Sequence, residues 1–404
     1  MQIFVNPNYD FVKWRLHAVA FSALIMLLGL GMYLTRGLNM GIDFSGGANV
    51  ILKFREQVPF DLLRSQIANA TVQRYGKAEE NAVLIRLPKQ GSEGDYAGQL
   101  VERLNTTLNP ESATKHDLNY QGRDTLAEIL KNADPDRKGT GPAAHDYYYN
   151  VAQSVVSKRS ELGLYSNMSQ VTSAPGVSSA SGKVISEKAF LGKFNVLNQE
   201  SVGPQVGKEL QQKAIWAVIL STIAMGIYIT FRFDLGFGVA AMICIVHDVL
   251  IALAFLVLIR GEFSLNIVAA LLLIVGYSVN DTVVTYDRVR ENARKLKGKV
   301  AFGDQLNNAM NQTLSRTILT SGSVILVLIS LVVFGGKVIH EFSLVLLVGV
   351  LSGTYSTLMI VPAVAVAWDK FMSSRRGGTT PRRVEANRSD ALPRKPAPER
   401  AKRA

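Results

Sequence analysis

Long apolar segments separated by polar stretches dominate the pattern of hydrophobic and polar positions along the chain. Six segments are long enough, or nearly so, to cross a bilayer. They lie at Leu16–Leu34, Ala214–Phe231, Phe237–Ile259, Leu265–Val284, Ile318–Phe334 and Phe342–Trp368. The second and fifth need flanking residues to complete a span at a rise of about 1.5 Å per residue. The pattern predicts an α-helical polytopic membrane protein with six spanning helices.

Residues 35–213, between the first two apolar segments, mix polar and apolar residues in the manner of a soluble domain. Strands are predicted at Asn49–Phe54, Ala82–Leu87 and Phe194–Gln199. Apolar residues recur at helical spacing from Phe60 to Ala70, and a second helix is predicted near Leu100–Leu108. The first two strands and the helix between them form a strand–helix–strand unit. We expect the whole to be a small α+β domain on a split sheet.

The middle of this region, about residues 109–190, reads as an insertion rich in turn residues. Glycine, proline, serine and aspartate cluster at residues 134–142 and again at Ser173–Ser181. Helices are predicted near Thr125–Asn132 and Ala144–Leu162, joined by mobile loops. The run Tyr147–Tyr149 either contacts a partner or packs a helix, and such runs more often pack a helix.

The formal net charge of +12 is explained by basic residues beside the membrane segments. Lysine and arginine crowd the sequence before the first segment, after the fourth and after the sixth, which lie on one side of a six-span topology. Both termini are therefore expected in the cytoplasm and residues 35–213 outside it. The expected order is a lead of residues 1–15, a retained anchor at 16–34, the exterior domain, a bundle at 214–371 and a disordered basic tail at 372–404. The tail could meet anionic lipid or RNA, but a solvated tail is the simpler interpretation, and no nucleic-acid partner is expected.

The most informative side chain is Asp281, which follows Asn280 inside the fourth apolar segment. A carboxylate at membrane depth costs about 2.5–3.5 kcal/mol, so one that is present usually has a partner and a function. Ser278 and Thr285 share its helix face. Arg316, at the start of the fifth segment, is the natural counter-charge, and protonation of Asp281 would break such a pair. The alternatives are a protonated packing carboxylate and an arginine that merely follows the positive-inside rule.

Two further features accompany this pair. His247 and Asp248 lie side by side within the third segment, where a carboxylate and an imidazole are the usual parts of a proton relay. Neighbouring helical residues point about 100° apart, so we expect the two not to face each other directly. The alternative is that they meet water or headgroups near the cytoplasmic end of the helix.

Two glycine-rich segments border the exterior domain and are interpreted as its hinges. The first runs from Gly41 to Gly47 and the second from Val202 to Gly207. The residues taken from them as hinge positions are Gly41, Asp43, Gly46, Gly47, Gly203, Pro204 and Gly207. The sequence contains no phosphate-binding loop, HExxH metal motif or GxSxG nucleophile motif, and its single cysteine, Cys244, excludes an internal disulfide. We therefore predict no metal, no cofactor and no covalent catalysis.

These segments together resemble the SecD/SecF family of bacterial protein-export membrane proteins. The resemblance rests on Gly41–Gly47, Val202–Gly207, Gly276–Val284, Arg316–Ser321 and the cytoplasmic-end residues Asp287, Arg288, Arg290 and Glu291. The Asn280-Asp281 pair and the single six-span unit favour the SecF branch over the SecD branch. The long insertion departs from the compact family domain and leaves its contacts open.

The resemblance implies a resistance-nodulation-division type bundle with a ferredoxin-like periplasmic domain, in the inner membrane. It implies a complex with SecD, association with the SecYEG channel, a possible YajC-like accessory subunit, and an unfolded preprotein as substrate. Proton motive force would drive late steps of translocation, with the relay carboxylate at Asp281 and the functional arginine at Arg316. A non-energised scaffold of the translocase and a small-molecule exporter of the same fold are the alternatives.

Overall fold

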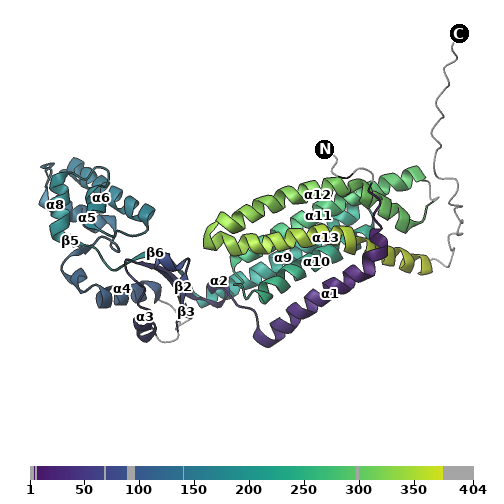
Figure 1. Cartoon of the computed structure of the whole chain (residues 1–404), viewed down its shortest axis with the longest axis horizontal. Helices are drawn as coiled ribbons and strands as arrows, with labels where there is room; N and C mark the ends of the chain where they lie inside the picture. Colours follow the sequence, from purple (N-terminus) through teal and green to yellow (C-terminus); the bar gives the residue numbers. More distant parts are fainter. Residues whose placement is uncertain are drawn as a thin grey trace, which may run out of the picture.

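The computed structural model describes residue 4 and residues 7–67, 70–88, 96–139, 141–296 and 300–375. It shows an elongated molecule in which a helix bundle carries a separate head at one end (Figure 1). The predicted tail lies almost wholly outside the described residues. The bundle end nearest the head is called the head end below, and the opposite end the far end.

Six helices of the described chain are long and apolar enough to cross a membrane, which confirms the predicted fold class. They are α1 (Phe11–Arg36), α9 (Pro204–Arg232), α10 (Leu235–Leu258), α11 (Leu265–Leu296), α12 (Phe302–Phe334) and α13 (Gly336–Arg375). Several begin at recognisable caps. Asp10 accepts a hydrogen bond from the Lys13 N–H at the start of α1, and Asp234 accepts one from the Leu235 N–H at the start of α10.

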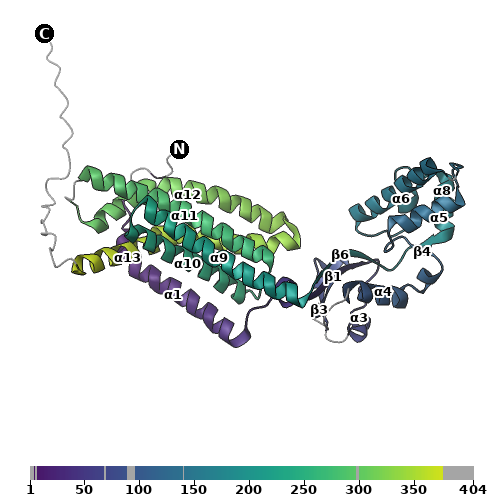
Figure 2. The ribbon, with the colours of Figure 1, turned by 180° about the vertical axis from the view of Figure 1, so that it is seen from behind.

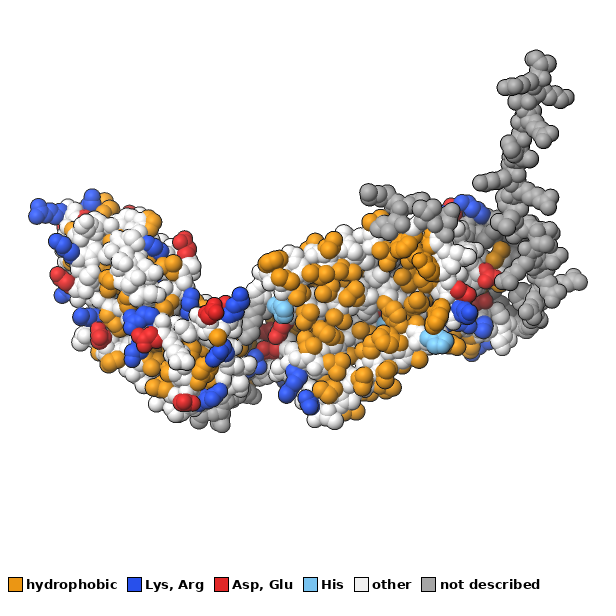
Figure 3. Space-filling model, viewed as in Figure 1, with side chains coloured by type: hydrophobic (Ala, Val, Ile, Leu, Met, Phe, Trp, Pro, Cys, Tyr) orange, Lys and Arg blue, Asp and Glu red, His pale blue; other side chains and the backbone are white. Residues whose placement is uncertain are grey.

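Hydrophobic side chains cover the flanks of the bundle, while charged side chains gather at its two ends (Figure 3). The core lies where α10, α11 and α13 meet, around residues such as Ala241, Ile274 and Val361. In the view from behind, α1 runs along the edge of the bundle beside α10 (Figure 2). Large exposed residues on α1, such as Leu24 and Leu27, are stable on the surface only in an apolar solvent such as lipid.

A four-stranded antiparallel sheet forms the part of the head that adjoins the bundle. In chain order its elements are β1 (Gly47–Phe54), α3 (Phe60–Gln66), β2 (Thr71–Tyr75), β3 (Ala82–Pro88), α4 (Tyr96–Leu108) and β6 (Phe194–Val202), with a 3₁₀ turn at Ala78–Glu80. The strand order is β2-β3-β1-β6, in which β1 pairs with both β3 and β6. This order is consistent with the predicted split sheet and with the ferredoxin-like domain that the family resemblance implies.

Strand β2 was not predicted. Of its five residues only Val72 is buried, because β2 lies at the edge of the sheet. An edge strand with one buried side chain gives no clear alternation of apolar and polar positions. The strand–helix–strand interpretation therefore omitted one strand of the sheet.

The residues between α4 and β6 form a second compact layer of the head. Its elements are a 3₁₀ turn at Pro110–Ala113, β4 (His116–Asp117), α5 (Arg123–Ala133), α6 (Pro142–Leu162), α7 (Met168–Thr172), α8 (Ser179–Lys188) and β5 (Ala189–Phe190). They share a core of their own, which includes Leu126, Leu130, Val151, Val155, Tyr165 and Ile185. Of the three adjacent tyrosines, Tyr148 is fully buried and its hydroxyl donates to Asp134, 2.7 Å away.

The stretch Ser173–Ser181 is mainly a turn between two short helices, because α7 ends at Thr172 and α8 begins only at Ser179. Asn167 and Gln170 form a reciprocal capping box at the start of α7. The Ser178 hydroxyl accepts a hydrogen bond from the Ser181 N–H, 2.9 Å away, and so caps α8. The serine-rich composition that predicts a loop therefore also supplies a helix cap.

Candidate functional site

Asp281 is buried in the bundle and is held by hydroxyl groups of α12. It lies sixteen residues after the first residue of α11, about 24 Å along the helix from its head end. Only 3% of the residue is exposed. Its Oδ2 accepts a hydrogen bond from Ser321 Oγ, 3.1 Å away, and its Oδ1 lies 3.5 Å from Thr320 Oγ1. Ser321 in turn accepts from Thr354 Oγ1 on α13, at 2.8 Å.

Arg316 does not contact Asp281. Among the described residues Asp281 has no cation within 4 Å, and the exposed Arg316 side chain makes no ion pair. It lines a cavity of about 440 Å³ at the far end of the bundle, together with Arg232, Asp287 and Arg288. Arg316 lies one helical turn before Thr320, the residue whose hydroxyl approaches Asp281. The ion pair between the two residues stays a prediction, and the structure shows them apart.

Asp248, on α10, is the second buried carboxylate and has the denser set of partners. It is fully buried, and its oxygens accept hydrogen bonds from Ser278 at 2.6 Å and from Ser352 and Ser356 at 2.8 Å each. The Nδ1 atom of His247 lies 2.9 Å from Asp248 Oδ1. Three helices therefore meet at this one carboxylate, since Ser278 belongs to α11 and both other serines to α13.

The expectation that His247 and Asp248 do not face each other was wrong. Their Cα–Cβ bonds diverge on the helix, but their side chains bring the His247 Nδ1 atom and the Asp248 Oδ1 atom within hydrogen-bond distance. The alternative interpretation required water or lipid headgroups around these residues. His247 is only 7% exposed and Asp248 is fully buried, so neither lies in such an environment. The His247 Nε2 atom is buried and has no hydrogen-bond partner among the described residues.

The junction between head and bundle is built from the two glycine-rich segments, packed against each other. Residues Ile42–Ser45 form a short helix, α2, which packs against the start of α9. Gly46 has a φ of +72°, in the left-handed region that favours glycine, and its neighbour Gly47 begins β1. A side chain at Gly207 would lie about 3.0 Å from the backbone of Phe44, so this close approach needs glycine.

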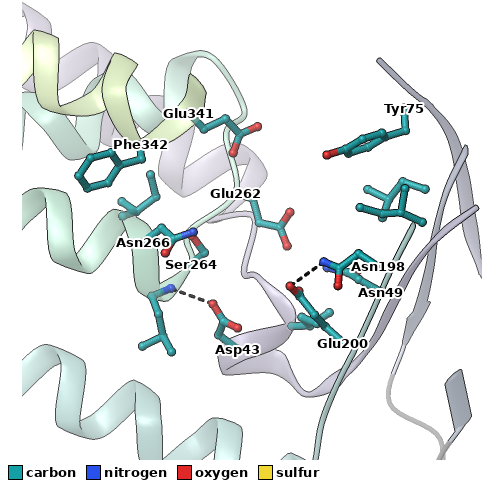
Figure 4. Close-up of a pocket in the computed structure, with 15 residues that line it drawn as sticks. Asp43, Asn49, Tyr75, Asn198, Glu200, Glu262, Ser264, Asn266, Glu341 and Phe342 are labelled. Atoms are coloured by element: carbon teal, nitrogen blue, oxygen red, sulfur yellow. Dashed lines mark hydrogen bonds between the residues drawn. The ribbon is translucent and has the colours of Figure 1, made fainter. Parts of the chain in front are cut away.

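Two contacts link this junction to the helix that carries Asp281. The Asp43 carboxylate accepts a hydrogen bond from the Leu265 N–H, 2.8 Å away, at the first residue of α11 (Figure 4). Arg86, on β3 of the sheet, forms an ion pair with Glu262 in the loop before α11, with 2.5 Å between Nη2 and Oε2. The head sheet is thus joined to the α10–α11 loop by an ion pair, and α2 is joined to α11 by a helix cap.

A pocket of about 330 Å³ opens between the sheet and the bundle at this junction. Figure 4 shows Glu262 and Glu341 on the bundle side, facing Tyr75 and Glu200 on the sheet side. Burial raises the pKa of the Glu262 carboxyl, Arg86 opposes that rise, and the neighbouring acids Glu341 and Asp43 add to it. The Glu262 carboxyl is therefore neutralised at a higher pH than a solvent-exposed glutamate would be.

Comparison with known proteins identifies the family. The model described as the C-terminal part of the protein export membrane proteins SecD/SecF matches residues 183–371, and the SecD/SecF GG motif matches residues 34–58. The protein translocase subunit SecF of Koribacter versatilis is 36% identical over 398 residues, which cover 94% of this chain and 96% of that protein. The chain belongs to the SecD/SecF family.

Solved structures agree with this assignment. The crystal structure of SecDF from Thermus thermophilus, described as a translocon-associated membrane protein, matches 92% of this chain with a TM-score of 0.63 and 27% identity. This chain spans only 40% of that structure. The Thermus thermophilus SecDF sequence is 44% identical over 176 residues, which are 24% of its length. This SecD/SecF family member therefore resembles one part of a longer, fused protein.

The family segments occupy defined places in the structure. The GG-motif match contains α2 and Gly46-Gly47, and the C-terminal match contains Gly203, Pro204 and both buried carboxylates. At the far end Arg288 pairs with Glu291 at 2.6 Å, and Lys295 contacts the same carboxylate at 2.6 Å. Arg290 is exposed and makes no ion pair with a described residue. Among the described residues no group of three or more His, Cys, Asp or Glu side chains could hold a metal ion.

Sequence reasoning missed the hydroxyl groups of α13. Ser352, Thr354 and Ser356 stand in a helix that is otherwise almost wholly apolar, and all three contact the carboxylate sites directly or through Ser321. The sequence did contain a signal for these residues, because hydroxyl side chains that recur within an apolar span often form hydrogen bonds to another helix.

Asn280 lies beside Asp281 in the sequence but on a different face of the helix. Its side chain is exposed on the bundle surface, as is Gly276 one turn earlier. An amide at mid-span facing lipid would lack hydrogen-bond partners, which is costly in a bilayer.

Proposed function

We propose that this SecD/SecF family member couples proton movement through its bundle to the export of unfolded preprotein. The observation that carries the proposal is the pair of buried carboxylates, Asp281 and Asp248, held mainly by hydroxyl groups that rotate freely. A hydroxyl can donate to a carboxylate and accept from a carboxylic acid, so both protonation states keep their hydrogen bonds.

Protonation of Asp281 would change its interaction with Arg316. This arginine lies one helical turn before Thr320 and lines a polar cavity. An ionised Asp281 attracts the arginine, and a neutral one releases it. A gradient of about 200 mV is worth roughly 4.6 kcal/mol per charge moved, several times the thermal energy. That amount is sufficient to bias a two-state rearrangement of packed helices.

The route from this site to the head runs along α11. Its first residue is capped by Asp43, and the loop before it is paired with the sheet through Arg86 and Glu262. A tilt or shift of α11 would therefore move the sheet. In this proposal the head lies on the exterior side of the inner membrane and holds or releases the emerging preprotein, while both termini are cytoplasmic.

The partner proposed for the exposed face of α11 is a SecD-type bundle, in a complex that assists the SecYEG channel. The relative in Thermus thermophilus carries both names in one fused protein, SecDF, and this chain matches only part of it. The exposed Asn280 supports the same arrangement, since a second bundle would give its amide hydrogen-bond partners.

The test is gradient-dependent completion of preprotein export in inverted membrane vesicles, with SecD present. The chain is compared with Asp281→Asn, and with Asp369→Asn as a matched control at an exposed far-end aspartate. We expect Asp281→Asn to lose the gradient's contribution at normal abundance, while the control keeps it. Unchanged gradient dependence in Asp281→Asn would instead support a non-energised scaffold.

A further inference from the structure

A lipid-facing groove lies between α1 and α10 near the head end of the bundle. It has a volume of about 370 Å³ and an almost wholly apolar lining, which includes Met26, Leu30, Tyr33, Leu250, Leu253 and Val257. Both helices end at the head end, so the groove leads along the bilayer toward its surface. An apolar groove of this kind fits a hydrocarbon chain.

Small residues make the floor of the groove. A side chain at Gly29 would collide with Ala254, so the backbones of α1 and α10 lie in direct contact at this point. Leu30 and Leu250, beside the contact, are about half exposed and form the walls. The depression is therefore set by backbone packing and is present before any ligand binds.

Two arginines flank the head end of the groove in the sequence. Arg36 lies between the lining residues Tyr33 and Leu38, and Arg260 follows the lining residue Val257 by three positions, in the turn after α10. Both are exposed, and neither makes an ion pair with a described residue. In the proposed orientation they lie on the exterior side, where membrane proteins carry fewer arginines.

The backbone at Arg260 strengthens this point. Its φ is +56°, in the left-handed region, which is uncommon for residues other than glycine, asparagine and aspartate. Glycine would fit this turn with less strain. An arginine placed there despite the conformational cost suggests that its side chain has a use.

We propose that the groove binds one anionic phospholipid, with an acyl chain between α1 and α10 and the phosphate between Arg36 and Arg260. Arginine binds phosphate oxygens through two parallel N–H groups, and a lipid with net negative charge gains more from two arginines than a zwitterionic one. Each arginine near the surface contributes about a fivefold preference, so the pair should favour the anionic lipid roughly 30-fold.

The test uses a tryptophan reporter in the full chain, in proteoliposomes. Trp14, Trp216 and Trp368 are replaced by phenylalanine, and Leu30→Trp places a fluorophore on the groove wall. The matched control is Ile329→Trp, on α12, which is similarly exposed and lies at a similar distance from the head end of its helix. Quenching is compared between brominated phosphatidylglycerol and brominated phosphatidylcholine, each as a minor component of the vesicle.

We expect phosphatidylglycerol to quench Leu30→Trp at a much lower mole fraction than phosphatidylcholine does, while both lipids quench Ile329→Trp equally. Adding Arg36→Gln and Arg260→Gln should remove the preference. Equal quenching of Leu30→Trp by both lipids would overturn the proposal, since the groove would then be ordinary lipid contact. Quenching at Ile329→Trp alone would also overturn it, because a protein segment would then fill the groove. None of these readouts depends on export, so they stand apart from the test of the proposed function.

Discussion

The carboxylate of Asp43 accepts a hydrogen bond from the backbone N–H of Leu265, with 2.8 Å between Oδ2 and N. The two residues are far apart in the chain, yet together they form the N-terminal cap of α11. Asp43 lies in α2, which leads through Gly46 and Gly47 into the central strand β1. The cap of the helix that carries Asp281 is thus supplied by the segment that starts the head.

Replacing Asp43 with alanine is expected to loosen the first turn of α11. A lost side-chain cap costs about 0.5–2 kcal/mol, and Asp43→Asn should keep most of this because an amide oxygen also accepts the bond. Thermal unfolding of the purified chain and hydrogen exchange at residues 265–268 measure the effect. Asp124→Ala, in the exposed first turn of α5, is the control. Equal effects of the two alanine variants would contradict a capping role.

Asp248 is expected to be far more important for stability than Asp281. Asp248→Ala leaves Ser278, Ser352 and Ser356 without their common acceptor, at about 1–3 kcal/mol for each hydroxyl group that finds no other partner. Asp281→Asn keeps a carbonyl oxygen for Ser321. The midpoint of thermal unfolding in detergent should therefore fall by much more for Asp248→Ala than for Asp281→Asn. A drop of similar size in the two variants would show that the dense hydroxyl set adds nothing.

The sequence was sufficient for the six spans, because an apolar run of about twenty residues has few alternatives in a folded chain. It was also sufficient to single out Asp281 and Asp248, since carboxylates stand out in such runs. It could not supply their partners. Ser321, Ser352 and Ser356 come from other helices, and which hydroxyl meets which carboxylate depends on helix rotation and crossing, which hydropathy does not encode.

The same limit applies at the junction. Glycine patterns predicted tight turns near Gly46, but nothing local indicated that Arg86, on a strand, would meet Glu262, in a loop between spans. Contacts across such sequence separations follow from the placement of whole domains. The serine-rich stretch near Ser178 shows a related ambiguity, because residues typical of loops are also the residues that cap helices, and Ser178 ends a turn and caps α8.

The Arg86–Glu262 ion pair is expected to hold the sheet against the α10–α11 loop. Both side chains are 21% exposed, so breaking the pair from one side should cost about 1–2 kcal/mol. Glu262→Gln and Arg86→Gln should each speed proteolysis at the junction, and the exchanged pair Arg86→Glu with Glu262→Arg should restore protection. Arg74→Gln, on the edge strand, is the control. Additive effects in the double-mutant cycle would contradict a direct interaction.

His116 is expected to make the second layer of the head sensitive to acid. The side chain is 4% exposed, and burial, with a smaller contribution from Arg159, lowers its pKa to about 4. Its Nδ1 has no described partner, so a proton there would gain no hydrogen-bond acceptor. The unfolded chain binds this proton near pH 6.5 and the folded chain only near pH 4, so stability is lost as the pH falls between these values.

The full effect of that shift is about 3 kcal/mol, reached near pH 4. Hydrogen exchange of α5 and α6 in the full chain at pH 7.5 and pH 5, corrected for intrinsic exchange, measures it. His116→Asn cannot take up the proton and should lose less protection at pH 5 than the parent chain, whereas His145→Asn, at an exposed position, should behave like the parent. The adjacent Asp117 has a raised pKa, so its contribution has the opposite sign and reduces the net loss at the acidic end. If His116→Asn lost as much protection as the parent chain, the acid sensitivity of this layer would have to come from another group.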